Sequence, residues 1–298
     1  MKMNPICKRE MKVAVRSIRI PAIITVCTSI LALVALLSMY LNVAQVKMTA
    51  EIQYRSFLEL YMFVTVIEFL MLVFLMPALT AGAISGERER QTLDIMMTTM
   101  VSRWDIVSGK LFSSLMVMFL VIISTFPILA LVFVYGGIGW LDMGILMICY
   151  FISALLTGGI GVFCSTLFRR STVSTVIAYS ITAVFFIGTY AANWLTQSLV
   201  AMGSAGAYAI SETVGKSGSG GMLYLLLFNP SATFAVILGG QMNPMRVNPE
   251  NWFGMRPANM ITEHWVFISM ALQLAAAVCI IWAAVKMMDR ERIKGKYA

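Results

Sequence analysis

Six long apolar runs dominate the sequence and limit what it can fold into. The runs cover residues 20–42, 57–84, 111–135, 141–167, 172–196 and 264–286. A helix needs about 20 apolar residues to cross the hydrocarbon core of a membrane. We therefore predict an all-α integral membrane protein with six membrane-spanning helices, folded as a single membrane domain over residues 1–298.

The charged residues are few and lie in short segments beside the apolar runs. They make up 12% of the chain, whereas soluble domains carry about 25%, so the sequence leaves no room for a large soluble domain. The net charge of +8 could indicate nucleic-acid binding. Because the basic residues flank the apolar runs, they are typical of membrane topology instead, and we expect no nucleic-acid partner.

The distribution of Lys and Arg predicts which loops face the cytoplasm. With the N-terminus inside, five of the 22 basic residues lie outside, namely Lys47, Arg55, Lys216, Arg246 and Arg256. This asymmetry follows the positive-inside rule. It predicts cytoplasmic N- and C-termini, a cytoplasmic loop over residues 85–105, an extracytoplasmic segment over residues 197–262, and location in the cell (inner) membrane.

The extracytoplasmic segment contains a further apolar run, residues 221–240. A seventh span there would place the basic C-terminal tail outside, and Asn229-Pro230 interrupts the run near its middle. We interpret it as a broken element, re-entrant or interfacial, that precedes the last span. Non-helical backbone at that depth must be shielded by protein or water.

The N-terminal segment, residues 1–19, precedes the first span and is amphipathic. Over residues 4–19, apolar side chains share one helical face and basic side chains cover the other. Such a helix lies along a membrane interface. The alternative is a cluster of charges that serves only to orient the first span.

The cytoplasmic loop contains a second amphipathic pattern. Its apolar residues recur at helical spacing: Leu93, Met96, Met97, Met100, Val101 and Trp104. A surface helix resting on lipid would explain this periodicity. However, lipid-seeking helices favour Lys and Arg on the polar face, whereas this face carries both signs of charge. The loop also joins two spans, so it is suited to receive force from a soluble partner. Ser102 and Asp105 resemble a capping box at the start of the third span.

Within the spans, Glu68 is the one carboxylate well inside an apolar run. Ionisable groups at that depth usually face a cavity or a partner, so Glu68 is a candidate pathway residue, with a protonated interhelical bond as the alternative.

The fifth span carries polar and aromatic residues along one face, comprising Thr175, Tyr179, Thr182, Phe186, Tyr190 and Asn193. This face is either a substrate surface or a packing seam. Ser153, Thr157, Gly161 and Ser165 in the fourth span indicate close helix packing.

The end of the second span and the loop after it carry a recognisable pattern. Residues 84–93 begin with a Glu-rich stretch and continue into Thr-Leu, and residues 106–110 open the third span with Gly-Lys. This pattern resembles the type-2 ATP-binding-cassette (ABC) permease family. Gln91 stands where the family commonly has Gly, and Met100 stands where Pro is frequent.

The resemblance implies a permease domain and a mechanism. Residues 87–101 would be the coupling helix that docks on a separate cytoplasmic ABC ATPase subunit, with residues 4–19 as the connecting helix beside it. The residues implied at that interface are Glu87, Arg88, Glu89, Arg90, Thr92, Leu93 and Met96. Spans two and five would line a pathway formed with a second permease, the same or a related chain. The pathway candidates in this chain are Glu68, Thr175, Tyr179, Thr182, Phe186 and Tyr190.

The ATPase site itself is not expected in this chain. A phosphate-binding loop needs Gly-x-x-x-x-Gly-Lys-Ser/Thr. Gly215-Lys216-Ser217 ends like one, but Ile210 stands where the first Gly is required. ATP and Mg²⁺ would therefore bind to the partner, and we expect no catalytic residue, metal ligand or cofactor here. The sequence is also compatible with two alternatives, an ion-coupled secondary transporter or channel and a non-transporting membrane scaffold.

Overall fold

The computed structural model describes residues 18–49, 54–93, 96, 102–136, 139–205, 220–242, 261 and 264–295. The longer helices are α2 (Arg19–Thr49), α3 (Tyr54–Thr80), α6 (Arg103–Gly136), α7 (Trp140–Leu167), α8 (Ser171–Ala183), α9 (Thr189–Ala205), α10 (Pro230–Met242) and α13 (Trp265–Gly295). The short elements are α4 (Ser85–Glu89), the π-helical turn η1 (Val184–Gly188) and the 3₁₀ helix η2 (Gly220–Phe228). The described residues thus form an all-helical protein, as predicted.

Six segments of the described chain are long and apolar enough to cross a membrane. They are Pro21–Leu41, Leu60–Glu89, Arg103–Pro127, Trp140–Leu167, Ser171–Leu199 and Trp265–Met288. The six predicted spans are therefore confirmed. The third helix begins at Arg103, directly after Ser102, which agrees with the capping pattern predicted at Ser102 and Asp105. The apolar run 111–135 covers only the later turns of this helix, because its first turns carry polar residues. Most of the predicted connecting helix, residues 4–17, lies outside the described residues.

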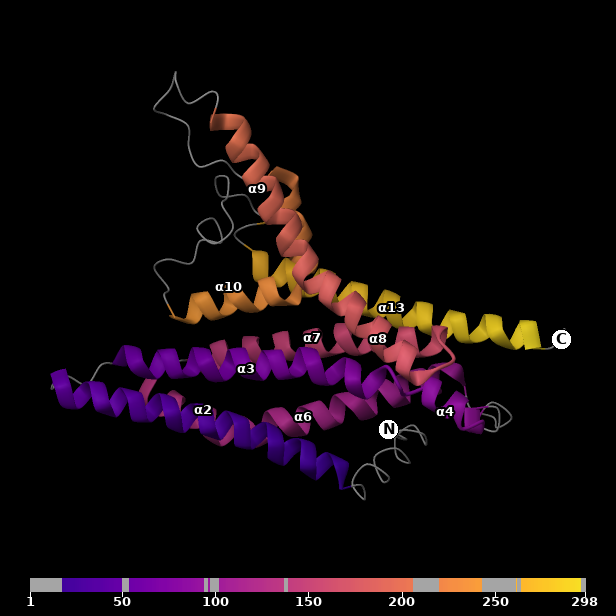
Figure 1. Ribbon diagram of the computed structural model, residues 1–298, viewed down its shortest axis with the longest axis horizontal. Coiled ribbons are helices and arrows are strands. Elements are labelled where there is room, and N and C mark those ends of the chain that lie inside the picture. Colours follow the sequence, from indigo (N-terminus) through magenta and orange to yellow (C-terminus); the bar gives the residue numbers. More distant parts are fainter. Residues whose placement is uncertain are drawn as a thin grey trace.

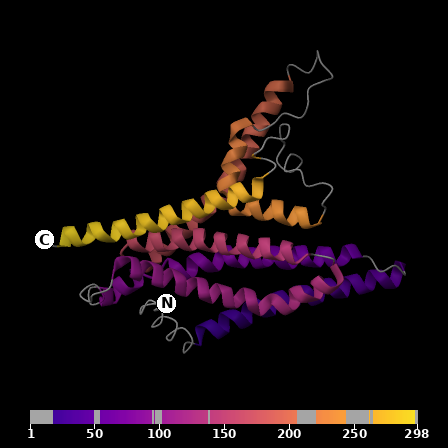
Figure 2. The same ribbon diagram turned by 180° about the vertical axis from the view of Figure 1, so that it is seen from behind.

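The helices form a bundle in which α7 is central and α2 is peripheral (Figures 1 and 2). Helix α7 packs against α3, α6, α8, α10 and α13, and it is the most buried of the six candidate spans. Helix α2 lies at the edge of the bundle, where it packs against α3 and α6. The start of α2, all of α4 and the last turns of α13 lie at the same end of the bundle, which we name the α4 end.

Small residues on α7 bring it close to α3. A Cβ atom added at Gly158 would lie 2.5 Å from Met76 Cε, and one added at Gly161 would overlap the Thr80 side chain. Ser153 and Thr157 on the same face are fully buried. Small residues allow helix backbones to approach closely in membranes. The predicted packing role of this face is therefore confirmed.

Ser165 extends the same face of α7 to the α4 end of the bundle. Its Oγ accepts hydrogen bonds from the backbone N–H groups of Ile84 (2.8 Å) and Ser85 (2.9 Å). The first N–H groups of a helix lack partners within the helix. Ser165 therefore fixes the start of α4 against α7 from outside.

The predicted interruption at Asn229-Pro230 is confirmed as a sharp bend. Helix η2 ends at Phe228, α10 begins at Pro230, and the two elements meet at 89°. Gln273 on α13 supports the bend, because its Nε2 donates to Leu227 O (3.1 Å) and Thr233 Oγ1 (2.7 Å). Backbone groups freed at the break thus find partners inside the protein, as an apolar surrounding requires.

Candidate functional site

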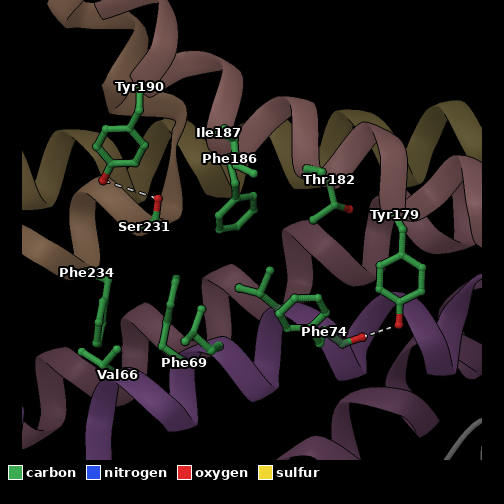
Figure 3. Close-up of a pocket in the computed structure, with 13 residues that line it drawn as sticks. Val66, Phe69, Phe74, Tyr179, Thr182, Phe186, Ile187, Tyr190, Ser231 and Phe234 are labelled. Carbon is green, nitrogen blue, oxygen red and sulfur yellow. Dashed lines mark hydrogen bonds between the residues drawn. The ribbon is translucent and has the colours of Figure 1, made fainter. Parts of the chain in front are cut away.

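A groove of about 470 Å³ lies between α3 on one side and α8, η1, α9 and α10 on the other (Figure 3). Its walls are mostly aliphatic and aromatic. The lining residues are Val66, Phe69, Leu70, Val73, Phe74, Tyr179, Thr182, Ala183, Phe186, Ile187, Tyr190, Ser231 and Phe234. The groove therefore runs between the second and the fifth predicted spans and is closed at one end by α10.

Stacked aromatic rings line the groove where α3 meets α10. The rings of Phe69 and Phe234 are parallel within 5°, with centroids 4.3 Å apart. Tyr150 on α7 packs against both rings from behind, with centroids 6.3 Å and 6.1 Å away. Aromatic pairs in such offset arrangements contribute about 0.5–1.5 kcal/mol beyond their area burial. This part of the groove is therefore firmly packed.

Asn229 connects the bend before α10 to the π-helical turn of the fifth span. Its Nδ2 donates to Phe186 O (2.9 Å) and Thr189 Oγ1 (2.7 Å), and its side chain is fully buried. A π-helical turn is rare and commonly accompanies a functional site. Here the π-helical turn directs Phe186 O toward the side-chain amide of Asn229. The hydrogen bond connects the groove wall at η1 to the bend between η2 and α10.

Four of the predicted pathway residues line the groove, and two do not. Tyr179, Thr182, Phe186 and Tyr190 lie on its α8–η1–α9 wall. Thr175 is one turn outside the groove, and its Oγ1 donates to Ser171 O (2.8 Å) within α8. Glu68 is on a different face of α3. The part that any of these residues plays in transport stays a prediction.

Glu68 points into the core of the bundle, away from the groove. Its side chain is 1% exposed, and Thr125 Oγ1 on α6 donates to its Oε1 (2.6 Å). Its Oε2 has no hydrogen-bond partner within the described residues. Tyr150 lies beside it and donates to Thr65 O (2.9 Å). The structure thus joins Glu68 to α6 and α7, which agrees with the alternative of an interhelical bond.

The Glu68–Thr125 bond leads to a stability prediction. Thr125→Val keeps the shape of the side chain but removes the donor, and interhelical hydrogen bonds in membranes contribute about 0.6–2 kcal/mol. We expect Thr125→Val to destabilise the protein by that amount, whereas Glu68→Gln, which keeps an acceptor for Thr125, changes stability less. Thermal unfolding of the purified variants in detergent measures both. Unchanged stability of Thr125→Val would show that the Glu68–Thr125 bond does not contribute to the stability of the bundle.

At the α4 end, the chain leaves α3 through a turn and forms the single helical turn α4. Helix α4 ends at Glu89, Arg90 is its C-cap, and Gln91 follows with φ = 57°. The left-handed region that follows a helix favours Gly, which has no Cβ. The prediction of a coupling helix that begins at residue 87 and continues without a break is therefore wrong, because the chain turns at Arg90 and Gln91. The same geometry explains why Gly suits the position that Gln91 occupies.

Side chains of α4 bind to the starts and ends of three other helices. Lys110 on α6 donates to Glu87 Oε1 at 3.0 Å, and the side chains are 6% and 21% exposed. At the start of α8, Ser171 donates its backbone N–H and its hydroxyl to Glu89, at 2.9 Å and 2.8 Å. Arg88 Nη2 donates to Thr166 O on α7 (3.3 Å). One helical turn is thus connected to the third, fourth and fifth spans.

The remaining predicted coupling residues differ in their surroundings. Thr92 donates to the Glu87 side chain, Leu93 is 3% exposed in the core, and Met96 packs against that core. Arg90 is exposed at the surface. Residues 94–95 and 97–101 lie outside the described residues, and with them most of the predicted amphipathic helix. Contacts of this segment with another protein stay a prediction.

The sequence does not predict the contacts of three residues that organise these two regions. Lys110 belongs to the family pattern and Ser171 to the start of a span, but neither has a partner that the pattern indicates. Asn229 is predicted only as half of a helix-breaking pair. The residue types alone cannot show that Lys110 pairs with Glu87 across 23 positions, or that Asn229 reaches the fifth span across 40.

Comparison with models of protein families gives a match. A family model described as "ABC-2 family transporter protein" matches residues 4–287, nearly the whole chain. A search of curated proteins finds no match. The matched range covers every candidate span, the groove and the α4 contacts.

Proposed function

The chain belongs to the ABC-2 family of transporters, and on that premise we propose that it is the permease subunit of an ATP-driven exporter. Its six apolar helices make it a multi-pass membrane protein, and its family is one of membrane transport subunits. In this proposal it resides in the cell (inner) membrane with both termini in the cytoplasm. The ATP and Mg²⁺ are bound by separate cytoplasmic ATPase subunits.

The observation that supports coupling is the set of bonds around α4. Because Glu87, Arg88 and Glu89 bind α6, α7 and α8, a displacement of α4 is transmitted to the starts or ends of three spans at once. Energetic coupling between sites needs such a chain of packed and bonded groups. We assign residues 87–101 as the segment on which the ATPase acts. The side chains of α4 then attach this segment to the bundle, and the exposed Arg90 faces the ATPase subunit.

The groove is the best candidate for the pathway within one chain. It is open on one side and lined by the second and fifth spans, so a second permease, the same or a related chain, could complete it. Closure of the ATPase subunits would shift α8 through Glu89 and Ser171, and α8 carries one wall of the groove. The geometry therefore offers a direct mechanical route from the cytoplasmic loop to the pathway.

Photo-crosslinking from Arg90 tests the proposal. We replace Arg90 by a benzophenone amino acid in the full chain, irradiate native membranes and purify the product. We expect a crosslink to a protein that hydrolyses ATP and contains a phosphate-binding loop. The same substitution at Leu141, which is 83% exposed at the opposite end of the bundle, is the control and should give no such product. A crosslink from Arg90 to lipid alone, or to a partner without nucleotide hydrolysis, would reject the coupling role.

A further inference from the structure

The groove has almost no free hydrogen-bonding capacity along most of its length. Tyr179 donates its hydroxyl to Phe74 O (2.7 Å), and Thr182 donates to Ala178 O (2.8 Å). No charged residue lines the walls. A ligand in this part of the groove would lose its hydration without gaining polar partners, which is costly for any polar or charged group. The walls therefore suit an apolar ligand segment.

Tyr190, at the α10 end of the groove, is the exception. Ser231 has one hydroxyl proton, which its 2.7 Å bond to Asn229 Oδ1 uses. The Tyr190 hydroxyl is 3.5 Å from Ser231 Oγ, at the outer limit for a hydrogen bond. Its proton can therefore be donated to a closer acceptor. Figure 3 shows this hydroxyl at one end of the groove and Tyr179 at the other.

The dimensions of the groove fit a small ligand. Tyr179 and Tyr190 are 11 positions apart on the fifth span, which corresponds to about 16 Å at 1.5 Å per residue. The volume of about 470 Å³ lies within the usual range of ligand pockets, roughly 300–1,000 Å³. Leu70, Phe74 and Ile187 form an exposed apolar rim, while Phe69 and Phe186 are buried at the back. A ligand can thus enter sideways from the membrane.

We propose that the groove binds a single-chain amphiphile, with its alkyl or acyl chain along the apolar walls and a headgroup oxygen accepting a hydrogen bond from Tyr190. This inference rests on the proposed function, because it names the class of substrate that the exporter carries. The headgroup lies at the α10 end, opposite to the α4 end on which the ATPase acts. The amphiphile is therefore oriented with its polar group toward the extracytoplasmic side.

Photolabelling of the purified full chain tests the inference. We reconstitute it in phosphatidylcholine nanodiscs, add a palmitic acid that carries a diazirine in its chain, irradiate, and map the labelled residues by mass spectrometry. We expect labels on groove residues such as Phe69 and Ile187, displaced by excess unlabelled palmitic acid but not by a water-soluble dipeptide. Label on the lipid-facing residue Leu36 of α2, which is 69% exposed, should not be displaced.

Two variants sharpen the test, and each has a matched comparison. Ala183→Trp fills the groove from an exposed position, and Ala271→Trp makes the same change on an exposed position of α13 outside it. One methylene of misfit in an apolar pocket changes binding by about tenfold or more, so we expect at least that loss of displaceable label with Ala183→Trp and none with Ala271→Trp. Tyr190→Phe should weaken competition by palmitic acid several-fold but not that by an alkane without a headgroup.

The outcomes distinguish this inference from the proposed function. Groove label that excess palmitic acid does not displace means that the groove holds bulk lipid only, and the inference fails. Formation of a copy-to-copy disulfide by Ile187→Cys, with the groove unlabelled, means that a second copy fills it, and the inference fails. Neither result bears on the crosslink from Arg90, which tests the ATPase partner independently. Displaceable label without that crosslink would reject the exporter and retain the binding site.

Discussion

Gly161→Ala is expected to destabilise the protein strongly, because α7 has no room for a methyl group at this position. The added Cβ would overlap Thr80 on α3 and lie 3.3 Å from the Ala81 backbone nitrogen. Thr80 cannot turn away freely, since its hydroxyl donates to Met76 O (2.7 Å). Overpacking of a tightly packed interior costs about 1–3 kcal/mol, and sometimes more. Thermal unfolding in detergent, together with the yield of monodisperse protein, measures the effect.

The same helix provides the control for this substitution. A Cβ at Gly144 of α7 would have nothing within 4 Å, and Ala is favoured over Gly in a helix by about 0.8–1.0 kcal/mol. Gly144→Ala should therefore leave stability unchanged or raise it slightly. Thr80→Ala removes the hydroxyl that the new methyl group meets, so combining it with Gly161→Ala should recover part of the loss. Equal behaviour of Gly161→Ala and Gly144→Ala would contradict the close α3–α7 approach.

Replacing Glu87 and Glu89 together with Ala is expected to abolish substrate-stimulated ATP turnover or assembly with the ATPase. The double variant removes the bonds of α4 to Lys110 on α6 and to Ser171 on α8. Coupling free energies between sites are typically about 1–3 kcal/mol, which corresponds to a roughly 5- to 150-fold effect. We expect stimulated turnover of the reconstituted complex to fall within that range or below detection.

Further variants separate coupling from general damage. Lys110→Met breaks the same ion pair from the α6 side and should reduce stimulation, while the exchange of Glu87→Lys with Lys110→Glu should restore part of it. Lys286→Met is the control, because the ammonium group of this α13 residue lies 4.8 Å from the Trp282 ring centroid on the same helix. It should leave turnover unchanged. Full stimulation in the double Glu variant would show that the α4 contacts do not transmit force.

Much of the architecture could be predicted because hydropathy acts over short stretches of sequence. An apolar run of sufficient length must be helical in a membrane, so the six spans follow from the runs themselves. The break at Asn229-Pro230 could be predicted for a similarly local reason, since Pro cannot continue a helix hydrogen-bond pattern. The start of α6 at Arg103 agrees with the capping pattern at Ser102 and Asp105, whereas hydropathy alone marks only residues 111–135, because the first turns of α6 carry polar residues.

The candidate sites could be predicted only in part. Helical periodicity placed Tyr179, Phe186 and Tyr190 on one face, and the structure shows that this face lines a groove. Periodicity could not show that Glu68 faces α6 instead, because a buried carboxylate is equally compatible with several neighbouring helices. In the cytoplasmic loop, the charged stretch around Glu87 gave no indication that its side chains bind within the chain.

The sequence by itself determined the class of protein, the number and position of the spans, and the family resemblance, all of which depend on residues close together along the chain. Only the tertiary structure decided which helices touch, that α4 is bonded to three spans, that Asn229 holds the π-helical turn, and that the groove walls are almost entirely apolar. The physical reason is that hydrophobic burial is non-directional, whereas hydrogen bonds, ion pairs and close packing require particular atoms at particular distances. Those distances join residues far apart in sequence, so they exist only once the bundle has formed.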